Sequence, residues 1–297
     1  MTLNNPTLFA STVLIWGTTW YVILGQLGTV HPVVSVGWRF LAAGSILLAI
    51  CTVRGIPMRL PLTVHGLALL QGLTLFGINY CLFYTASLTL TTGLISVIFS
   101  TMVFWNALGA HWVLGKPLEA SVLTGGGIAI TGLALLFLSE IEALAWTDQT
   151  VVALSLCVCA TLCASAGNLI SAKTQGAGYS LWPTTGFGML YGSIMVLIGA
   201  RLAGIPWEFD FTWLYVGSFL YLVLLGSVAG FAAYLTLLGR VGPGRVAYAT
   251  VAFPVVAMGL SVLFENAVLD HWTALAVALV LLGNWLGLTR HHRNTLA

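Results

Sequence analysis

Residues 63–86 read TVHGLALLQGLTLFGINYCLFYTA, a stretch that contains no Asp, Glu, Lys or Arg. About 20 such residues form an α-helix long enough to cross the hydrocarbon layer of a membrane. The rest of the chain resembles this stretch, since 59% of its 297 residues are hydrophobic and only 6% are charged. Soluble domains carry about 25% charged residues. The composition therefore indicates an all-α integral membrane protein with almost no soluble portion.

Ten stretches of this kind follow one another, separated by charges and by clusters of Gly and Pro. They predict transmembrane helices over residues 8–26, 33–51, 63–86, 90–113, 119–138, 150–170, 180–201, 213–238, 245–265 and 271–288. No charge marks the junction at residues 87–92, so the count of ten depends on a loop forming there.

The distribution of charges tests this count. With the N-terminus in the cytoplasm, eight of the ten basic residues fall on the cytoplasmic side: Arg54, Arg59, Lys116, Lys173, Arg240, Arg245, Arg290 and Arg293. Arg39 and Arg201 fall near the outer side, and all acids but Glu119 fall outside: Glu140, Glu142, Asp148, Glu208, Asp210, Glu265 and Asp270. Membrane proteins concentrate Lys and Arg in their cytoplasmic loops, and an odd number of helices would destroy this bias. We therefore predict that both termini are cytoplasmic.

The ten predicted helices divide into two sets of five at the polar segment 141–149. We predict a first five-helix repeat over residues 1–143 and a second over residues 144–297. Because five is odd, the second repeat would enter the membrane from the opposite face. Inverted repeats of this kind are a common plan of secondary transporters, in which two similar halves rock around a central site.

A weak internal similarity accompanies this division. An offset of 153 residues places Gly77 on Gly230 and Leu82 on Leu235. The identities are sparse, and helices rich in Leu, Gly and Ala also match by chance. The offset is therefore an interpretation for the structure to test.

Five short motifs occur in order along the chain: Leu14-Ile15-Trp16-Gly17-Thr18-Thr19-Trp20, Trp38-Arg39-Phe40, Leu114-Gly115-Lys116-Pro117, Phe253-Pro254-Val255-Val256-Ala257 and Leu263-Phe264-Glu265. Their order and spacing resemble the signatures of the drug/metabolite transporter superfamily, although Lys116 stands where that superfamily usually has an acid. The resemblance covers nearly the whole chain. It is nearest to the ten-helix branch with two EamA-type units, and within it to the YddG-like aromatic amino-acid exporters.

This resemblance implies a multi-pass protein of the bacterial inner membrane that exports amino acids or related metabolites from the cytoplasm. It says less about the solute, because the superfamily also moves drugs, sugars and nucleotide sugars.

Charged groups are missing from the middle of the predicted helices. Proton-coupled carriers and pumps for cationic drugs usually hold an intramembrane carboxylate, and no Asp or Glu lies mid-span. Buried basic residues are missing too; Arg39 is the one possible partner for an anion, and its place toward the outer end favours a structural or interfacial role. The histidines fall near span ends or in the tail. We expect a nearly neutral cavity for a neutral or zwitterionic solute, which moves down its own gradient without obligatory proton coupling.

Polar and aromatic side chains do lie at mid-depth. Trp16 and Trp20 are four residues apart and share one helix face. Buried amides and hydroxyls must meet protein, water or substrate, and aromatic rings provide apolar walls with a polar tip. We predict that the substrate-binding residues are Trp16, Trp20, Asn79, Tyr80, Phe83, Tyr84, Ser100, Trp105, Asn168, Tyr234 and Tyr248. The alternative for each is a place in an interfacial aromatic belt or a hydrogen bond between helices.

Pro254 is the one proline deep inside a predicted helix. A proline lacks the N–H that would bond the carbonyl four residues back, here that of Thr250. Freed backbone within a membrane needs another partner and often borders a transport site. We therefore predict a hinge at Pro254, with a passive kink as the alternative.

These observations favour a secondary transporter that exports amino acids by alternating access, with a multidrug or other metabolite carrier as the alternative. A membrane-embedded enzyme needs a nucleophile with a base, paired carboxylates or a metal cluster at one depth, and a scaffold subunit needs no cavity. Cys157 and Cys159 point to different sides of a helix, so they predict no metal site with Cys163. We expect no cofactor, no nucleic-acid partner at a net charge of +2, a small-molecule substrate in a lipid bilayer, and a chain compatible with a monomer.

Overall fold

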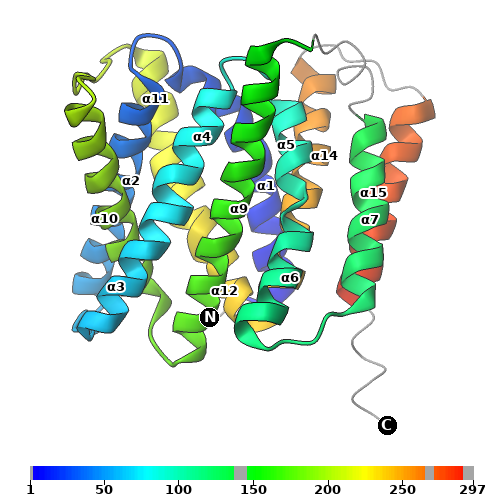
Figure 1. The fold of residues 1–297 in the computed structure, drawn as a ribbon, viewed down its shortest axis with the longest axis horizontal. Helices are drawn as coiled ribbons and strands as arrows, with labels where there is room; N and C mark the ends of the chain where they lie inside the picture. The colour runs from blue at the N-terminus through cyan, green and yellow to red at the C-terminus, as the bar shows by residue number, and fades with distance from the viewer. Residues whose placement is uncertain (1–2, 137–145, 265–270, 290–297) are drawn as a thin grey trace.

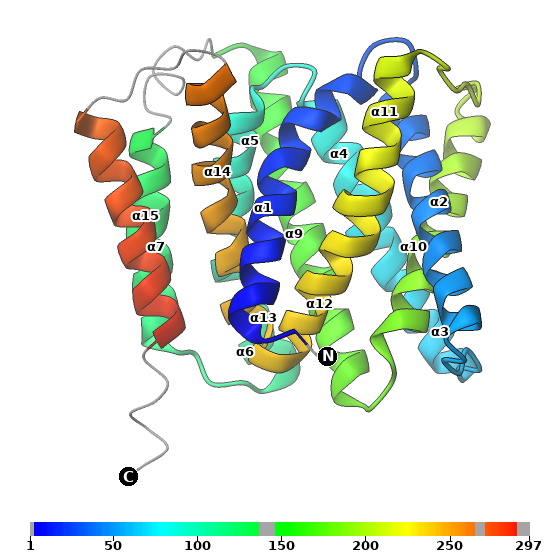
Figure 2. The same ribbon diagram turned by 180° about the vertical axis from the view of Figure 1, so that it is seen from behind.

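The structure is a computed structural model that describes residues 3–136, 146–264 and 271–289. Within these ranges the chain forms ten consecutive helical segments that run alternately up and down a single bundle (Figures 1 and 2). In order they are α1 (Asn5–Ile23) with η1 (Leu24–Gln26); α2 (Pro32–Val53); α3 (Leu62–Gln71), η2 (Gly72–Ile78) and α4 (Asn79–Ala86); α5 (Thr92–Ser100) and α6 (Met102–Leu114); α7 (Ala120–Leu136); α9 (Asp148–Gly176); α10 (Leu181–Leu202); α11 (Trp213–Tyr221), η3 (Leu222–Ala229) and α12 (Gly230–Val241); α13 (Pro243–Val246) and α14 (Tyr248–Phe264); and α15 (His271–Thr289).

The predicted all-α fold is confirmed. Seven segments are long and apolar enough to cross a membrane, and residues 120–135 and 274–287 add two shorter apolar helices. The uncertain junction is a loop, because α4 ends at Ala86 and Thr91 caps the start of α5 by accepting the Leu94 N–H at 3.3 Å. The sixth segment is longer than predicted and continues to Gly176.

Helices of the first half pack against helices of the second half, and the pattern of these contacts stays the same when the two repeats are exchanged. α2 packs against α10 and α7 against α15, so each pair joins a helix to its counterpart five segments later. α4 packs against α9, and α1 packs against α12. The exchange of repeats takes α4 to α12 and α9 to α1, so these two contacts are counterparts of each other. The α7–α15 pair forms one edge of the bundle, and α2 with α10 lies at the opposite edge (Figures 1 and 2).

Close contacts between α2 and α10 show the inversion residue by residue. A Cβ added to Gly37 would lie 2.5 Å from Leu197, and one added to Gly186 would lie 2.7 Å from Leu48. An offset of 149 residues takes Gly37 to Gly186 and Leu48 to Leu197. The start of each helix therefore meets the end of the other, as two counterparts of opposite direction require.

The α7–α15 pair obeys the same rule. A Cβ added to Gly132 would lie 2.7 Å from the carbonyl oxygen of Ala276, and one added to Gly283 would lie 2.5 Å from that of Gly125. An offset of 151 residues relates these two contacts. The offsets of 149 and 151 differ from the predicted 153, because the repeats share helix packing more than side-chain identity. The predicted boundary between residues 143 and 144 lies outside the described residues.

The third and eighth segments each contain a π-helical stretch at mid-length, η2 and η3. α1 begins and α15 ends at the same side of the bundle, which we call the terminal side (Figures 1 and 2). Positions along the axis are given below relative to that side.

Candidate functional site

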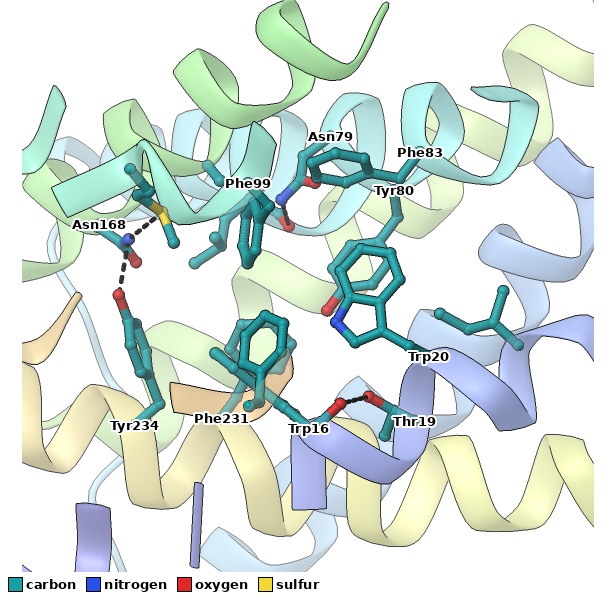
Figure 3. A pocket seen from close by; sticks show the side chains of 15 residues that line it. Trp16, Thr19, Trp20, Asn79, Tyr80, Phe83, Phe99, Asn168, Phe231 and Tyr234 are labelled. Carbon is teal, nitrogen blue, oxygen red and sulfur yellow. Dashed lines mark hydrogen bonds between the residues drawn. The ribbon is translucent and has the colours of Figure 1, made fainter. Parts of the chain in front are cut away.

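A cavity lies inside the bundle, between the two repeats (Figure 3). Its walls come from the first, third and fourth segments and from their counterparts, the sixth, eighth and ninth. The lining residues are Trp16, Thr19, Trp20, Ile23, Leu75, Asn79, Tyr80, Phe83, Phe99, Met102, Ala164, Asn168, Phe231, Tyr234 and Phe253. Each repeat thus contributes the same three segments to one central site.

Four aromatic rings close the cavity on the side away from the termini. The ring centroid of Trp20 lies 5.7 Å from that of Phe83, 6.1 Å from that of Phe99 and 6.0 Å from that of Phe253. Phe83 and Phe99 meet edge to face at 5.2 Å. This aromatic lid joins α1, α4 and α5 of the first repeat to α14 of the second, so opening the cavity on this side has to break ring contacts between the repeats.

The opposite end of the cavity is closed by a polar pair and two rings. Asn168 Nδ2 donates to the Tyr234 hydroxyl at 3.0 Å (Figure 3). The Trp16 ring lies 4.8 Å from Tyr234 and 5.0 Å from Phe231, and Trp16 Nε1 donates to the Gly226 carbonyl at 3.1 Å. These side chains form the floor of the cavity. Because Trp16 belongs to α1 and the others to the second repeat, the floor also joins helices of both repeats.

The cavity is contracted in this conformation. Its free space is about 40 Å³, and a single water molecule needs roughly 10–15 Å³ by the same kind of measure. A few waters fit there, whereas an amino acid does not. Binding a solute therefore requires the lining side chains to move apart.

Two buried side-chain amides line this space, and each has one atom without a hydrogen-bond partner in the described part of the chain. Asn79 Nδ2 donates to the Leu75 carbonyl at 3.3 Å, and Asn168 Nδ2 donates to Tyr234. The Oδ1 atoms of Asn79 and Asn168 have no hydrogen-bond partner within the described residues. A buried acceptor without a donor costs about 1–3 kcal/mol. Both side chains line the cavity, so a solute N–H or O–H that reaches these oxygens in an expanded cavity would supply the missing donor.

The structure brings together seven of the eleven predicted site residues: Trp16, Trp20, Asn79, Tyr80, Phe83, Asn168 and Tyr234. It places the other four elsewhere. Trp105 is 37% exposed and its Nε1 donates to Thr101 at 3.3 Å. The Tyr248 hydroxyl donates to the Val122 carbonyl at 2.6 Å, where it ties α14 to the α7–α15 pair.

Tyr84 and Ser100 also lie behind the cavity wall. Tyr84 accepts a hydrogen bond from Arg39, and Ser100 contacts the backbone of α14. The depth of these side chains in the membrane could be predicted from the sequence, but the face of the helix on which they lie could not. The same ambiguity hid lining residues such as Phe99, Phe231 and Phe253, which carry no polar atom to single them out.

The expectation that no basic residue is buried is wrong for Arg39. Its side chain is 1% exposed and lies deep inside the bundle, not at an interface. Arg39 Nε donates to the Ser227 hydroxyl at 2.9 Å, and Nη1 donates to the Tyr84 hydroxyl at 3.1 Å. Arg39 therefore joins α2 and α4 of the first repeat to η3 of the second.

Pro254 lies inside α14, and the structure supplies a partner for the carbonyl that it frees. The Ser100 hydroxyl lies 2.9 Å from the Thr250 carbonyl oxygen and 2.8 Å from that of Ser96 in its own helix. α5 of the first repeat thus bonds the interrupted helix of the second. Ser100 therefore has a structural role at the site of the predicted hinge.

A Ser100→Ala variant is expected to lower the free energy of unfolding by about 1–3 kcal/mol, because the buried Thr250 carbonyl loses a donor. A Pro254→Ala change restores an N–H four residues after Thr250, so Ser100→Ala should cost less in that background. Thermal unfolding of the four proteins in detergent measures the coupling. Ser45→Ala, which removes a hydroxyl bonded to Leu41 on an exposed face, is the control. Equal costs of Ser100→Ala in both backgrounds would contradict the assignment.

A wider space of about 530 Å³ lies between the cavity floor and the terminal side of the bundle. Its lining includes the basic residues Lys116, Arg240 and Arg245 and the acid Glu119. Arg245 pairs with Glu119 at 2.5 Å, which links α13 of the second repeat to the start of the first repeat's α7. We call this space the basic vestibule. This ion pair gives a role to Glu119, the one acid predicted to lie on the same side as most of the basic residues.

Comparisons with known proteins agree on one kind of protein. The model of the EamA-like transporter family matches residues 6–138 and 151–289, which is nearly the whole chain in two similar parts. A protein of Escherichia coli K12 described as "Probable amino-acid metabolite efflux pump" is 21% identical over 283 residues, covering 92% of this chain and 91% of the relative. "Uncharacterized inner membrane transporter YedA", also of Escherichia coli K12, is 27% identical over 295 residues, covering 92% and 89%.

A solved structure described only as "Crystal structure of protein" has the same fold, with a TM-score of 0.73 at 18% sequence identity. The superposition covers 95% of both chains. At this identity the likeness concerns the fold alone.

Proposed function

The chain belongs to the EamA-like transporter family, and from this premise we propose that it exports amino acids, aromatic and other neutral or zwitterionic ones, or related metabolites from the cytoplasm by alternating access. It is a multi-pass membrane transporter and not an enzyme. The observation that carries the proposal is the contracted cavity between two inverted repeats, lined by aromatic rings and by two asparagines whose amide oxygens have no donor among the described residues. Rings accommodate an apolar side chain, and amide oxygens accept from an ammonium group.

The arrangement of the closed ends supports alternating access. The aromatic lid, through Trp20 and Phe253, and the floor, through Trp16 and Tyr234, each join helices of both repeats. A rocking motion of one repeat against the other would open one end while it keeps the other end shut. Pro254, one residue after the lid residue Phe253, is the proposed hinge for this motion.

We place the terminal side of the bundle in the cytoplasm of a bacterial inner membrane. In the described part of the chain, that side carries Arg54, Arg59, Lys116, Lys173, Arg240 and Arg245. This agrees with the concentration of basic residues in cytoplasmic loops, and one relative is described as an inner membrane transporter. The basic vestibule would then be the entrance for an exported solute.

A carrier of cationic drugs is less well supported. Among the described residues, those that line the cavity include no Asp or Glu, and carriers of cations pair the cargo with an intramembrane carboxylate. The guanidinium of Arg39, which lies against the ring of the lining residue Tyr80, would repel a cation.

The test is solute counterflow in liposomes that contain the purified protein. Vesicles loaded with unlabelled phenylalanine should accumulate labelled phenylalanine transiently, whereas vesicles without protein should not. Other neutral amino acids in the loading buffer should compete. An absence of exchange for every amino acid tested would refute amino-acid transport.

The same vesicles test the energy source. Because none of the described residues that line the cavity is a carboxylate, an imposed pH gradient is expected to leave the final distribution of labelled phenylalanine equal on both sides. Accumulation against a concentration gradient, driven by pH alone and abolished by a protonophore, would show proton coupling instead.

A further inference from the structure

Arg39 carries a buried positive charge whose contacts are all neutral in the described part of the chain. Its two hydrogen bonds end on the hydroxyls of Ser227 and Tyr84. Its guanidinium lies 5.1 Å from the ring centroid of Phe40 and 4.8 Å from that of Tyr80. No acid pairs with it there, since the ion pair among the described residues joins Arg245 to Glu119.

Such a charge is costly unless an anion compensates it. A guanidinium stays protonated in proteins, and moving an ion out of water costs several kcal/mol even after relaxation. Two hydroxyls and two ring faces recover only part of this cost. The bundle therefore holds a cation that would gain from a negatively charged partner.

The guanidinium is one side chain away from the cavity. Tyr80, whose ring it contacts, lines the cavity (Figure 3). A Cβ added to Gly226 would lie 3.1 Å from Arg39 Nη2 and 2.9 Å from the methyl group of Thr19, which is another lining residue. Because Gly226 has no side chain, Arg39 and the lining residue Thr19 can both lie close to its backbone. A shift of the Tyr80 ring, or of η3 against α1, would uncover the charge.

The basic vestibule points to the same class of ligand from a different part of the molecule. Three basic residues and one acid line it, so its net charge attracts anionic groups. A solute that enters there meets positive charge at the entrance and again behind the wall of the central cavity.

We propose that Arg39 is the carboxylate-binding subsite of the central cavity, so that the transported solutes are organic acids with an apolar body, amino acids among them. The proposal rests on the transport function proposed above. In the expanded cavity the solute carboxylate pairs with the guanidinium, a geometry that favours two parallel hydrogen bonds. The apolar part lies against Trp16 and Phe231, and the oxygens of Asn79 and Asn168 accept from the solute's ammonium group where it has one.

The experiment measures binding to the purified full-length protein by ligand-induced thermal stabilisation. The ligands are L-phenylalanine, 3-phenylpropionate, which lacks the ammonium group, and L-phenylalaninamide, which lacks the carboxylate. The wild type should bind both carboxylates more than about tenfold tighter than the amide. Arg39→Gln should weaken both carboxylates by at least about 30-fold, the effect of removing one member of a buried charge pair, and leave amide binding unchanged.

Two further variants separate binding from folding. Arg39→Lys keeps the charge but not the paired donors, so it should retain part of the preference for carboxylates. Arg201→Gln removes an exposed arginine from α10 and should change nothing. If Arg39→Gln does not fold, the wild-type comparison of acid with amide and the lysine variant still decide.

The outcomes separate this proposal from the transport function. Equal wild-type affinity for phenylalanine and its amide, or a folded Arg39→Gln variant that keeps its carboxylate affinity, would overturn the role of Arg39 alone. A wild type that none of the three ligands stabilises would overturn this proposal together with the proposed transport of aromatic amino acids.

Discussion

A Gly72→Ala variant is expected to lose most of the folded, monodisperse protein that the parent chain yields in detergent. A Cβ at Gly72 would overlap the carbonyl oxygen of Gly188 and lie 2.9 Å from the backbone nitrogen of Gly192. These are backbone atoms of α10, so the clash is relieved only by moving η2 and α10 apart. Overpacking typically costs about 1–3 kcal/mol and more where nothing can yield, and here two backbones would have to yield at the contact between the two repeats.

Gly66 provides the matched control. It lies in the same helical segment, and a Cβ added there would meet nothing within 4 Å. Gly66→Ala should therefore keep or raise the melting temperature, since alanine is favoured over glycine in a helix by about 1 kcal/mol. The melting temperature and the size-exclusion profile of both variants measure the effect. A Gly72→Ala protein as stable as Gly66→Ala would show that these helices are not in backbone contact.

The transmembrane helices could be predicted because lipid imposes a simple rule on the sequence. Every backbone group in the hydrocarbon layer must be bonded within a helix, so apolar length and flanking charges define each span. The π-helical stretches η2 and η3 escaped prediction. Their backbone pattern depends on how closely neighbouring helices approach, as α10 does at Gly72, and no local propensity records such a contact.

The depth of the site residues in the membrane could be predicted from the sequence, but the direction in which their side chains point could not. Trp16 and Trp105 both lie at mid-span, yet one lines the cavity and the other is partly exposed. In a soluble helix the polar face identifies the outside, whereas in lipid both faces are apolar. The polar cavity residues Asn79 and Asn168 were found because amides cannot face lipid. Phenylalanines carry no such signal.

Arg39 was misplaced because the rule for charges is too simple. Arginines near helix ends usually extend to the membrane surface. However, α2 begins at Pro32, so Arg39 lies roughly 10 Å along its axis at 1.5 Å per residue. Ser227 and Tyr84, which bond the guanidinium, come from helices far away in the sequence. The position of Arg39 along its helix indicates that the side chain is buried. Its hydrogen-bond partners can be identified only from the packed bundle.

A Trp16→Ala variant is expected to lose phenylalanine counterflow by more than about tenfold, because two ring contacts and one hydrogen bond are lost together. Trp16 contacts the rings of Phe231 and Tyr234, and its Nε1 bonds the Gly226 carbonyl. A Cβ added to Gly230 would lie 2.6 Å from that same nitrogen, so the indole is held tightly against α12. It is both a wall of the cavity and one of the contacts between α1 and the second repeat.

The comparison with Trp112 and with a smaller change at Trp16 distinguishes these two roles. Trp112 is 74% exposed, so Trp112→Ala removes a tryptophan without touching the cavity and should transport at the parent rate. Trp16→Phe keeps a ring but loses the bond to Gly226, and should be intermediate. Melting temperatures recorded beside the counterflow rates identify variants that fail to fold. If Trp16→Ala is folded and still exchanges phenylalanine at the parent rate, the indole contributes packing alone, and the solute would have to bind against the rings of the aromatic lid instead.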